Sequence, residues 1–281
     1  MRKLEALEAK YLKLKAQRDS LKRQRDHLES ELALARAPLE AMQREEDKQR
    51  ALRHRRQSKL PIPPEALRLR VHGAADEVAF LSLGDAIASG VKKILIAEAR
   101  PMESFQRILD FGCGCGRVIR FFEGLPKSCE LFATDIDPEA ISWCRENLKD
   151  LATFSRNNEE PPLDFAPDSF DFILAISVFT HLPESLELAW LGELKRIARP
   201  GAFLFLSVHG QTRFWRVPSA SYDELERRGF CYARCGVTAG LPDYYQTSFH
   251  SEAYIREHWS KFFRVRGIVA LCSQDVVICQ K

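Results

Sequence analysis

The chain has 281 residues, of which 45% are hydrophobic and 29% are charged, a balance typical of globular proteins that excludes collagen-like and wholly disordered classes. Its apolar runs are shorter than the roughly 18 residues of a membrane-spanning helix, so no transmembrane segment is expected. The charged N-terminus, MRKLEALEAK, lacks the apolar core of a signal peptide. We therefore expect the eight cysteines to be reduced thiols and the protein to be cytoplasmic.

The net charge of +3 is unevenly distributed along the chain. Residues 1–59 carry 17 basic and 10 acidic side chains, whereas residues 60–281 carry 25 basic and 29 acidic ones. Acidic residues are interleaved with most of the basic ones, which is typical of a solvated helix, but residues 50–59 (RALRHRRQSK) form a run of one sign. This run leaves contact with nucleic acid or with an anionic membrane surface open as an alternative.

Leucine recurs at a seven-residue interval near the N-terminus, at Leu7, Leu14, Leu21 and Leu28. The offset heptad position is occupied by Leu4, Tyr11, Arg18, Arg25 and Leu32. Such a repeat predicts a coiled coil, and hence self-association of the chain. A parallel dimer is the first interpretation, and an antiparallel pair or an intramolecular hairpin stays open.

Proline residues punctuate the segment that follows. Pro38 is expected to interrupt the helix, because proline lacks an N–H donor and clashes with the preceding turn, with a helical remnant over residues 42–56. Residues 59–64 (KLPIPP) predict an extended, stiff linker. The predicted organisation is a coiled-coil arm with a basic segment (1–58), a proline-rich linker (59–64) and a globular domain (65–281).

Short apolar runs alternate with helical patterns from about Phe105 onward. This alternation predicts βαβ units and an α/β fold with a mostly parallel sheet. Two closely spaced apolar segments, residues 262–271 and 275–280, predict an antiparallel hairpin at the sheet edge. Residues 65–100 predict two helices ahead of the first strand.

A glycine-rich loop, Asp110-Phe-Gly-Cys-Gly-Cys-Gly116, lies between the strand over residues 107–109 and a helix expected near Arg117. Alternate glycines let the backbone turn sharply and approach a ligand, and a helix N-terminus supplies unpaired N–H groups. Asp135 follows the last glycine by 19 residues, at the end of the next predicted strand, where a carboxylate can accept both ribose hydroxyls.

The spacing of the glycines separates this loop from other nucleotide-binding loops. The dinucleotide fingerprint is G-x-G-x-x-G and a Walker loop ends in Gly-Lys-Ser/Thr, whereas this loop is G-x-G-x-G after a carboxylate. The loop resembles motif I of the class I S-adenosylmethionine-dependent methyltransferases. The resemblance extends over roughly residues 65–281 and implies a Rossmann-like sheet of about seven strands with S-adenosylmethionine as the cofactor.

Further segments support the resemblance. Residues 131–141 (LFATDIDPEAI) resemble the second strand and turn of the family, which implies that Asp135 binds ribose and Ile136 packs on adenine. Residues 162–173 resemble the loop into the fourth strand, and Asn157, followed by Asn158, stands where the family often has a polar residue near the adenine amino group. The predicted cofactor-binding residues are Asp110, Gly112, Cys113, Gly114, Gly116, Asp135, Ile136, Asn157 and Ser177.

Another match and two departures concern the flanking loops. Residues 199–202 (RPGA) resemble the L-x-P-G-G turn before the fifth strand of the family, with Ala202 in place of the second glycine. Asp164 stands where proline is common. Neither position is a predicted cofactor contact.

Three histidines are candidate catalytic residues. His181 follows the strand over residues 172–177, at the expected ligand-binding edge. It could act as a base, position the substrate, or pack under the next helix. His209 follows the fifth strand at the same edge. His250 lies in an aromatic stretch, residues 243–250, where Tyr244, Tyr245, Gln246 and His250 form either a pocket wall for a polyol or a packed loop.

The predicted function is methyl transfer from S-adenosylmethionine to a small-molecule or glycan-like acceptor, with oxygen as the target. The N-P-P-[YF] signature of the adenine and glutamine methylating members is missing. The cysteine spacing, including the pair Cys231 and Cys235, does not match a zinc site, so no metal is expected. Two alternatives remain: a coiled-coil adaptor with an inactive methyltransferase-like domain, and an RNA methyltransferase that uses residues 50–59.

Overall fold

The computed structural model describes residues 2–73, 75–234 and 242–281. The chain divides into two compact units, residues 1–49 and residues 50–281. Helix α1 (Arg2–Gln57) makes up the described part of the first unit and continues into the second. Among the described residues, no helix is both long and apolar enough to cross a membrane.

Helix α1 runs through Pro38 without a break, so the predicted interruption is wrong. Proline removes one intrahelical hydrogen bond, but the flanking residues are mostly Leu, Ala, Glu, Arg and Gln, which are strong helix formers. The seven-residue register therefore continues on the same helix to Leu39 and Met42. These two side chains are exposed, as are those of Leu21 and Leu28.

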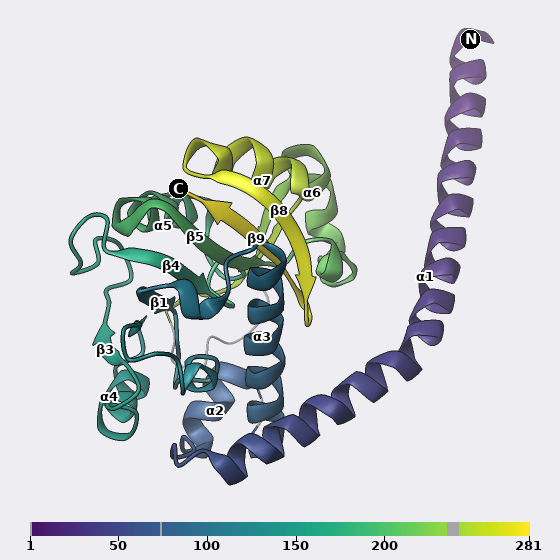
Figure 1. Cartoon of the computed structure of the whole chain (residues 1–281). Helices are drawn as coiled ribbons and strands as arrows, with labels where there is room; N and C mark the ends of the chain where they lie inside the picture. Colours follow the sequence, from purple (N-terminus) through teal and green to yellow (C-terminus); the bar gives the residue numbers. More distant parts are fainter. Residues whose placement is uncertain (1, 74, 235–241) are drawn as a thin grey trace. The chain divides into compact units, whose positions relative to one another are not determined.

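Seven strands in the described part of the second unit form one sheet in the order β3-β2-β1-β4-β5-β9-β8 (Figure 1). Strands β1 to β5 run parallel, and β9 is antiparallel to both β5 and β8. The strands are β1 (Arg107–Phe111), β2 (Glu130–Asp135), β3 (Thr153–Arg156), β4 (Phe170–Ala175), β5 (Ala198–Val208), β8 (Arg264–Leu271) and β9 (Gln274–Gln280). The predicted parallel sheet and C-terminal hairpin are confirmed.

Helices connect and cover these strands, and a separate two-stranded sheet lies between β5 and β8 in the sequence. The helices are α2 (Glu65–His72), α3 (Glu77–Ala97), α4 (Pro138–Asn147), α5 (Glu184–Ile197), α6 (Tyr222–Arg228) and α7 (Glu252–His258). The small sheet pairs β6 (Phe230–Ala233) with β7 (Thr247–His250), a pairing that the sequence analysis did not predict.

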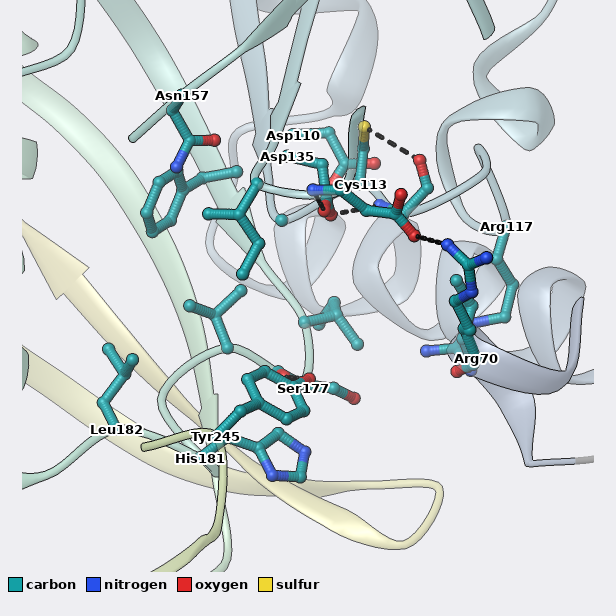
Figure 2. A pocket seen from close by; sticks show the side chains of 18 of the residues that line it. Arg70, Asp110, Cys113, Arg117, Asp135, Asn157, Ser177, His181, Leu182 and Tyr245 are labelled. Carbon is teal, nitrogen blue, oxygen red and sulfur yellow. Dashed lines mark hydrogen bonds and ion pairs between the residues drawn. The ribbon is translucent and has the colours of Figure 1, made fainter. Parts of the chain in front are cut away.

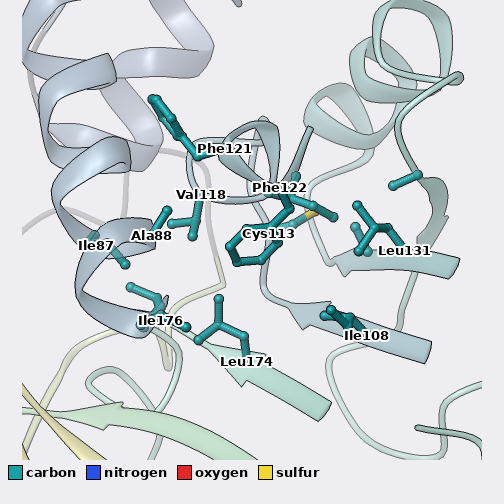
Figure 3. Packing of buried hydrophobic residues seen from close by; sticks show 14 of the residues in the cluster. Ile87, Ala88, Ile108, Cys113, Val118, Phe121, Phe122, Leu131, Leu174 and Ile176 are labelled. Carbon is teal, nitrogen blue, oxygen red and sulfur yellow. The ribbon is translucent and has the colours of Figure 1, made fainter. Parts of the chain in front are cut away.

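Both faces of the large sheet are buried, as expected for parallel strands. In β4 and the residue after it, Phe172, Leu174 and Ile176 point into one core with α3 and α4, whereas Ile173 and Ala175 point into another with α5 and α7. Figure 3 shows Ile87 and Ala88 of α3 near Ile176, in the same cluster as Leu174. This two-sided packing fixes the strands whose carboxyl ends carry the site described below.

The last turns of α1 belong to the second unit. Ala51 is fully buried in its core and the His54 ring lies 4.3 Å from that of Phe121. Arg50 and Arg55 form ion pairs with acidic residues of α3. The second unit therefore begins at Arg50, whereas the sequence analysis placed residues 50–58 in the arm.

Residues 58–64 are irregular, as predicted for a linker, but they are attached to the second unit. Leu60 and Ile62 pack against the same core as Ala51. The buried Arg120 side chain donates a hydrogen bond to the Pro61 carbonyl at 2.8 Å. The segment is therefore part of the globular unit and does not act as a free spacer.

The helix expected near Arg117 is absent from this described stretch, which instead forms a tight turn and a short 3₁₀ helix, Ile119–Phe122. The reason is the close approach of α3. A Cβ atom on Gly84 of α3 would lie 2.3 Å from the Arg117 carbonyl oxygen. Next to this contact between α3 and the turn, the Arg120 side chain donates a hydrogen bond to the Gly116 carbonyl.

Candidate functional site

A cavity of about 280 Å³ lies at the carboxyl ends of β1, β2 and β4. Strand β1 pairs with β2 on one side and β4 on the other, and open α/β sheets bind ligands where the strand order reverses in this way. Every predicted cofactor-binding residue except Gly116 lines this cavity. A Cβ atom on Gly116 would lie 2.7 Å from a Leu148 methyl carbon, so this glycine serves packing behind the loop.

The glycine loop is shaped by contacts that leave no room for side chains. Gly112 has φ +77°, and a Cβ atom there would lie 2.2 Å from a methyl group of Val178. At Gly114, with φ +54°, a Cβ atom would lie 2.6 Å from a methyl group of Val71. The amides of Gly112 and Cys113 donate to the carbonyl of Thr134 on β2. The loop is thus tied to β2 and lies open to the cavity.

Asp135 connects the loop to the end of β2. Its carboxylate accepts hydrogen bonds from the amide of Gly114 at 2.7 Å and from the amide of Asp137 at 2.9 Å. Burial raises the pKa of Asp135, and these amide donors oppose the increase. Each carboxylate oxygen retains a lone pair for a ligand hydroxyl.

Two buried oxygen acceptors in the cavity wall lack a partner among the described residues. They are Oδ2 of Asp110 and Oδ1 of Asn157. Burial, together with the charge of Asp135, raises the pKa of Asp110 to about 7, and Arg117 opposes this increase. Buried polar groups without partners are costly, so the wall matches a ligand with amino or hydroxyl donors.

Helix α2 closes one side of the cavity, a feature that the sequence analysis missed. Arg70 forms ion pairs with Asp137, at 2.8 Å, and with Glu139. The neighbouring Val71 packs on Gly114 and accepts a hydrogen bond from Arg117 at its carbonyl oxygen. No sequence motif marks α2, because its place at the site depends on contacts with residues more than 40 positions away.

His181 lies across the cavity from Asp110 and Asp135 (Figure 2). Its Nδ1 is 2.5 Å from the carbonyl oxygen of Gln246, and its ring stacks on that of Tyr245 with centroids 4.1 Å apart. Because a carbonyl oxygen only accepts, Nδ1 carries the proton and Nε2 is left as an acceptor. Burial lowers the pKa of His181, which keeps the ring neutral near pH 7.

The other two candidate histidines do not line the cavity. His250 is fully buried, with Nε2 at 2.5 Å from Glu187, whose carboxylate also accepts a hydrogen bond from Trp259. His209 lies behind His181, with ring centroids 6.1 Å apart, and burial lowers its pKa to about 3. Both histidines therefore support the wall from behind.

The predicted aromatic wall is formed in part. Tyr244 and Tyr245 line the cavity, whereas Gln246 contributes its backbone carbonyl to His181. The described residues contain no cluster of His, Cys, Asp or Glu that could hold a metal ion. Cys235, considered above in a cysteine pair, lies outside the described residues.

Comparison with known proteins connects this geometry to a class of enzymes. Residues 108–201 match a family model described as a methyltransferase domain. A 1,6-didemethyltoxoflavin-N1-methyltransferase from Burkholderia thailandensis, solved with its substrate and S-adenosylhomocysteine, has a TM-score of 0.50 and 16% identity, over 70% of this chain and 78% of the other. A protein from Pyrococcus horikoshii has a TM-score of 0.51 and 13% identity, over 69% and 89% of the two chains.

A methyltransferase from Methanosarcina mazei, described as dependent on S-adenosylmethionine, is 23% identical over 66% of this chain and 96% of the other, with a TM-score of 0.47. The family match, the sheet order and the glycine loop with its acidic partner define a class I Rossmann-like methyltransferase domain. Residues 108–201 therefore form a methyltransferase domain, whose fold is shared with an enzyme solved with S-adenosylhomocysteine bound.

Proposed function

We propose that this enzyme transfers the methyl group of S-adenosylmethionine to a hydroxyl oxygen of a small-molecule or glycan-like acceptor. The observation that carries the proposal is the state of His181, a neutral imidazole whose Nδ1 proton is bound to a backbone carbonyl and whose ring lines the cofactor cavity. This arrangement leaves Nε2 able to accept a proton from a hydroxyl group.

The predicted cofactor contacts are compatible with the cavity wall. Asp135 is placed to accept the ribose hydroxyls, and Ile136 offers an apolar surface to adenine. The unpartnered oxygen of Asn157 suits the adenine amino group, and that of Asp110 suits the amino group of the methionine part. The glycine loop allows close approach of the cofactor without a steric barrier.

When bound, S-adenosylmethionine supplies a methyl group on a positively charged sulfur, whose C–S bond breaks as the new C–O bond forms, leaving S-adenosylhomocysteine. The role of the protein is to orient the acceptor and remove its proton. His181 Nε2 takes up that proton, and the stacked ring of Tyr245 keeps the imidazole in place. The Gln246 carbonyl stabilises the imidazolium that results, through the Nδ1 proton.

Binding of the cofactor is tested by calorimetry with S-adenosylmethionine and S-adenosylhomocysteine. The wild type is expected to bind near one site per chain. Asp135→Ala is expected to weaken binding by about 100-fold, because two hydrogen bonds to a carboxylate are each worth about 1.5–3 kcal/mol, reduced by water that replaces them. Asp164→Ala, which removes an exposed carboxylate outside the cavity, is the matched control. Equal affinity in all three proteins would refute the assignment of Asp135.

The role of His181 is tested with His181→Asn, whose side-chain amide can still donate to the Gln246 carbonyl. We expect S-adenosylhomocysteine affinity within about threefold of the wild type and turnover lowered by roughly 10²–10⁴-fold, the usual contribution of a general base. Turnover is followed as release of S-adenosylhomocysteine over a panel of phenols, polyols and saccharides. Full activity of the variant on an acceptor used by the wild type would contradict the proposal.

The two alternatives make different predictions. An inactive adaptor would bind neither form of the cofactor, because it has no use for the cavity. An RNA methyltransferase would bind RNA with strong salt dependence through residues 50–59. Here Arg50 and Arg55 already pair with Asp85 and Glu77, which weakens the RNA alternative. No salt-dependent RNA binding by the wild type would remove it.

Self-association through residues 10–49 is part of the proposal. Leu14, Leu21 and Leu28 of the seven-residue repeat are exposed in the single chain, and a second copy of the same helix would cover them. A cytoplasmic location is also proposed, because Cys113, Cys115, Cys144 and Cys279 are buried free thiols, which suit a reducing compartment.

A further inference from the structure

A second cavity, of about 110 Å³, adjoins the cofactor cavity. It lies where the ends of β4 and β5 meet the turn between β8 and β9 and the side of α3. Three residues, Arg117, Ile176 and Ser177, line both cavities. A molecule that occupies the second cavity therefore lies next to the cofactor.

Arg117 is a buried cation without a direct ion pair among the described residues, although the charge of Asp110 acts on it from a distance. Its side chain is 7% exposed, and it forms no ion pair with a carboxylate among the described residues. One of its terminal nitrogens donates to the Val71 carbonyl at 2.8 Å, and its buried Nε has no hydrogen-bond partner among the described residues. A buried guanidinium is expensive unless it is paired and hydrogen-bonded. The side chain therefore has donors available for a negatively charged ligand.

The two cavities differ in the sign of their charge. The cofactor cavity contains four carboxylates, those of Asp110, Asp135, Asp137 and Glu159, which outnumber its two guanidinium groups, Arg70 and the shared Arg117. The described lining of the second cavity contains Arg117 and no carboxylate, and its other polar members are neutral side chains: Ser177, Ser207, Ser273 and Gln274. The cationic groups of the cofactor are attracted to the first cavity, and an anionic group is attracted to the second.

Ser177, which lines both cavities, is held in an unusual backbone conformation. Its φ of +62° is uncommon for a residue with a side chain and costs about 1–2 kcal/mol. Three hydrogen bonds hold it there: its amide donates to Ser207 Oγ at 2.7 Å, its hydroxyl accepts from Gln274, and its carbonyl accepts from Tyr245. Because its oxygen already accepts, the Ser177 hydroxyl has its proton available for an anion.

We propose that the second cavity binds a carboxylate group of the methyl acceptor, with Arg117 as its cation and the Ser177 hydroxyl as a second donor. The inference rests on the proposed function and narrows the acceptor class to hydroxy acids. The carboxylate anchors the acceptor on Arg117, and the hydroxyl that receives the methyl group lies on the side of His181. The carboxylate is not itself methylated, so the proton still passes to Nε2 of His181.

The first experiment compares a carboxylate with its neutral analogue on the full-length wild type saturated with S-adenosylhomocysteine. Benzoate and benzamide are titrated separately, and binding is measured from the rise in melting temperature. We expect benzoate to bind at least tenfold more tightly than benzamide. Equal binding of the two, or no binding of benzoate, would overturn the proposal whether or not any variant folds.

The second experiment uses Arg117→Met, with Arg256→Met as the control, since Arg256 is exposed and pairs with Glu252 on α7. Benzoate affinity is expected to fall at least tenfold in Arg117→Met and to stay unchanged in Arg256→Met. Arg117→Lys, which keeps the charge but loses the planar fork, is expected to lie between the wild type and Arg117→Met. Unchanged benzoate affinity in Arg117→Met would overturn the proposal.

The carboxylate of the cofactor could also be the partner of Arg117. A third measurement distinguishes it from the carboxylate of the acceptor. S-adenosylhomocysteine and 5′-methylthioadenosine, which lacks the amino acid part, are titrated into Arg117→Met. We expect both affinities to stay within threefold of the wild type. A tenfold loss confined to S-adenosylhomocysteine would assign Arg117 to the cofactor and refute this inference. If the wild type bound no S-adenosylhomocysteine at all, the proposed function itself would fail.

Discussion

The same residue type, leucine, has opposite surroundings in the two units of the molecule. In residues 10–49, the leucines at positions 14, 21 and 28 are between 55% and 65% exposed. In residues 50–281, the leucines of the sheet, such as Leu109, Leu174 and Leu204, are fully buried. Residues 10–49 present an apolar stripe, whereas the second unit encloses two large cores and a small third cluster.

This difference indicates what each unit needs in order to be stable. Complete burial of a leucine side chain stabilises a protein by about 1.5–3 kcal/mol, so covering a stripe of exposed leucines would add several such increments of stability. We propose that a second copy of the helix supplies the missing surface. The last apolar residues of the register, Leu39 and Met42, precede the second unit, which begins at Arg50. We therefore predict that assembly and cofactor binding respond to separate sets of changes.

Deletion of residues 1–49 has the largest expected effect, because it removes the entire stripe. The full chain is expected to sediment as a dimer and residues 50–281 as a monomer, with unchanged S-adenosylhomocysteine affinity. Analytical ultracentrifugation and calorimetry measure the two properties. A shortened protein that remained a dimer would place the interface in the second unit.

Substitution within the stripe tests the register. Leu21→Lys combined with Leu28→Lys is expected to weaken dimerisation at least 100-fold, since two apolar contacts are replaced by charges at the seam. Leu12→Lys is the matched control, because Leu12 is also exposed but lies outside the two seam positions. Equal loss of the dimer in the control would show that the seven-residue register does not define the interface.

The cofactor cavity is expected to respond to pH without any change in assembly. In the free protein the pKa of Asp110 is raised to about 7, and the cationic cofactor favours the ionised carboxylate, so binding lowers that pKa. Affinity therefore increases with pH, by about tenfold between pH 6 and pH 8 if the bound carboxyl remains ionised throughout. Asp110→Asn is expected to remove this dependence in calorimetric titrations. A wild type whose affinity is constant from pH 6 to pH 8 would contradict the burial argument.

The smallest expected effect concerns the boundary between the units. A chain that begins at residue 60 loses Ala51, the His54–Phe121 contact and two ion pairs with α3. Compared with residues 50–281, its melting temperature is expected to fall by roughly 5 °C, the shift that corresponds to about 2 kcal/mol in a domain of this size. Equal melting temperatures would show that residues 50–59 do not stabilise the second unit and would place the boundary between the units in residues 59–64.

Much of the fold and the cofactor site could be read from local patterns. The alternation of apolar runs predicted the parallel sheet, and the spacing between the glycines and Asp135 placed the loop and the acid at one cavity. These features depend on residues close in sequence, whose geometry the backbone restricts to few choices. The effect of Pro38 was misjudged, because strong helix formers on both sides outweigh the loss of a single hydrogen bond.

By itself the sequence determined the fold class, the cofactor loop and the seven-residue leucine repeat. Only the tertiary structure decided which histidine faces the cavity: His181, His209 and His250 all lie near the same edge, but Glu187 holds His250 in the core. The tertiary structure also showed that Arg117 lines two cavities and that α2 lies beside the glycine-rich loop. The physical reason is that burial and charge pairing depend on groups distant in the chain, which a local pattern does not specify.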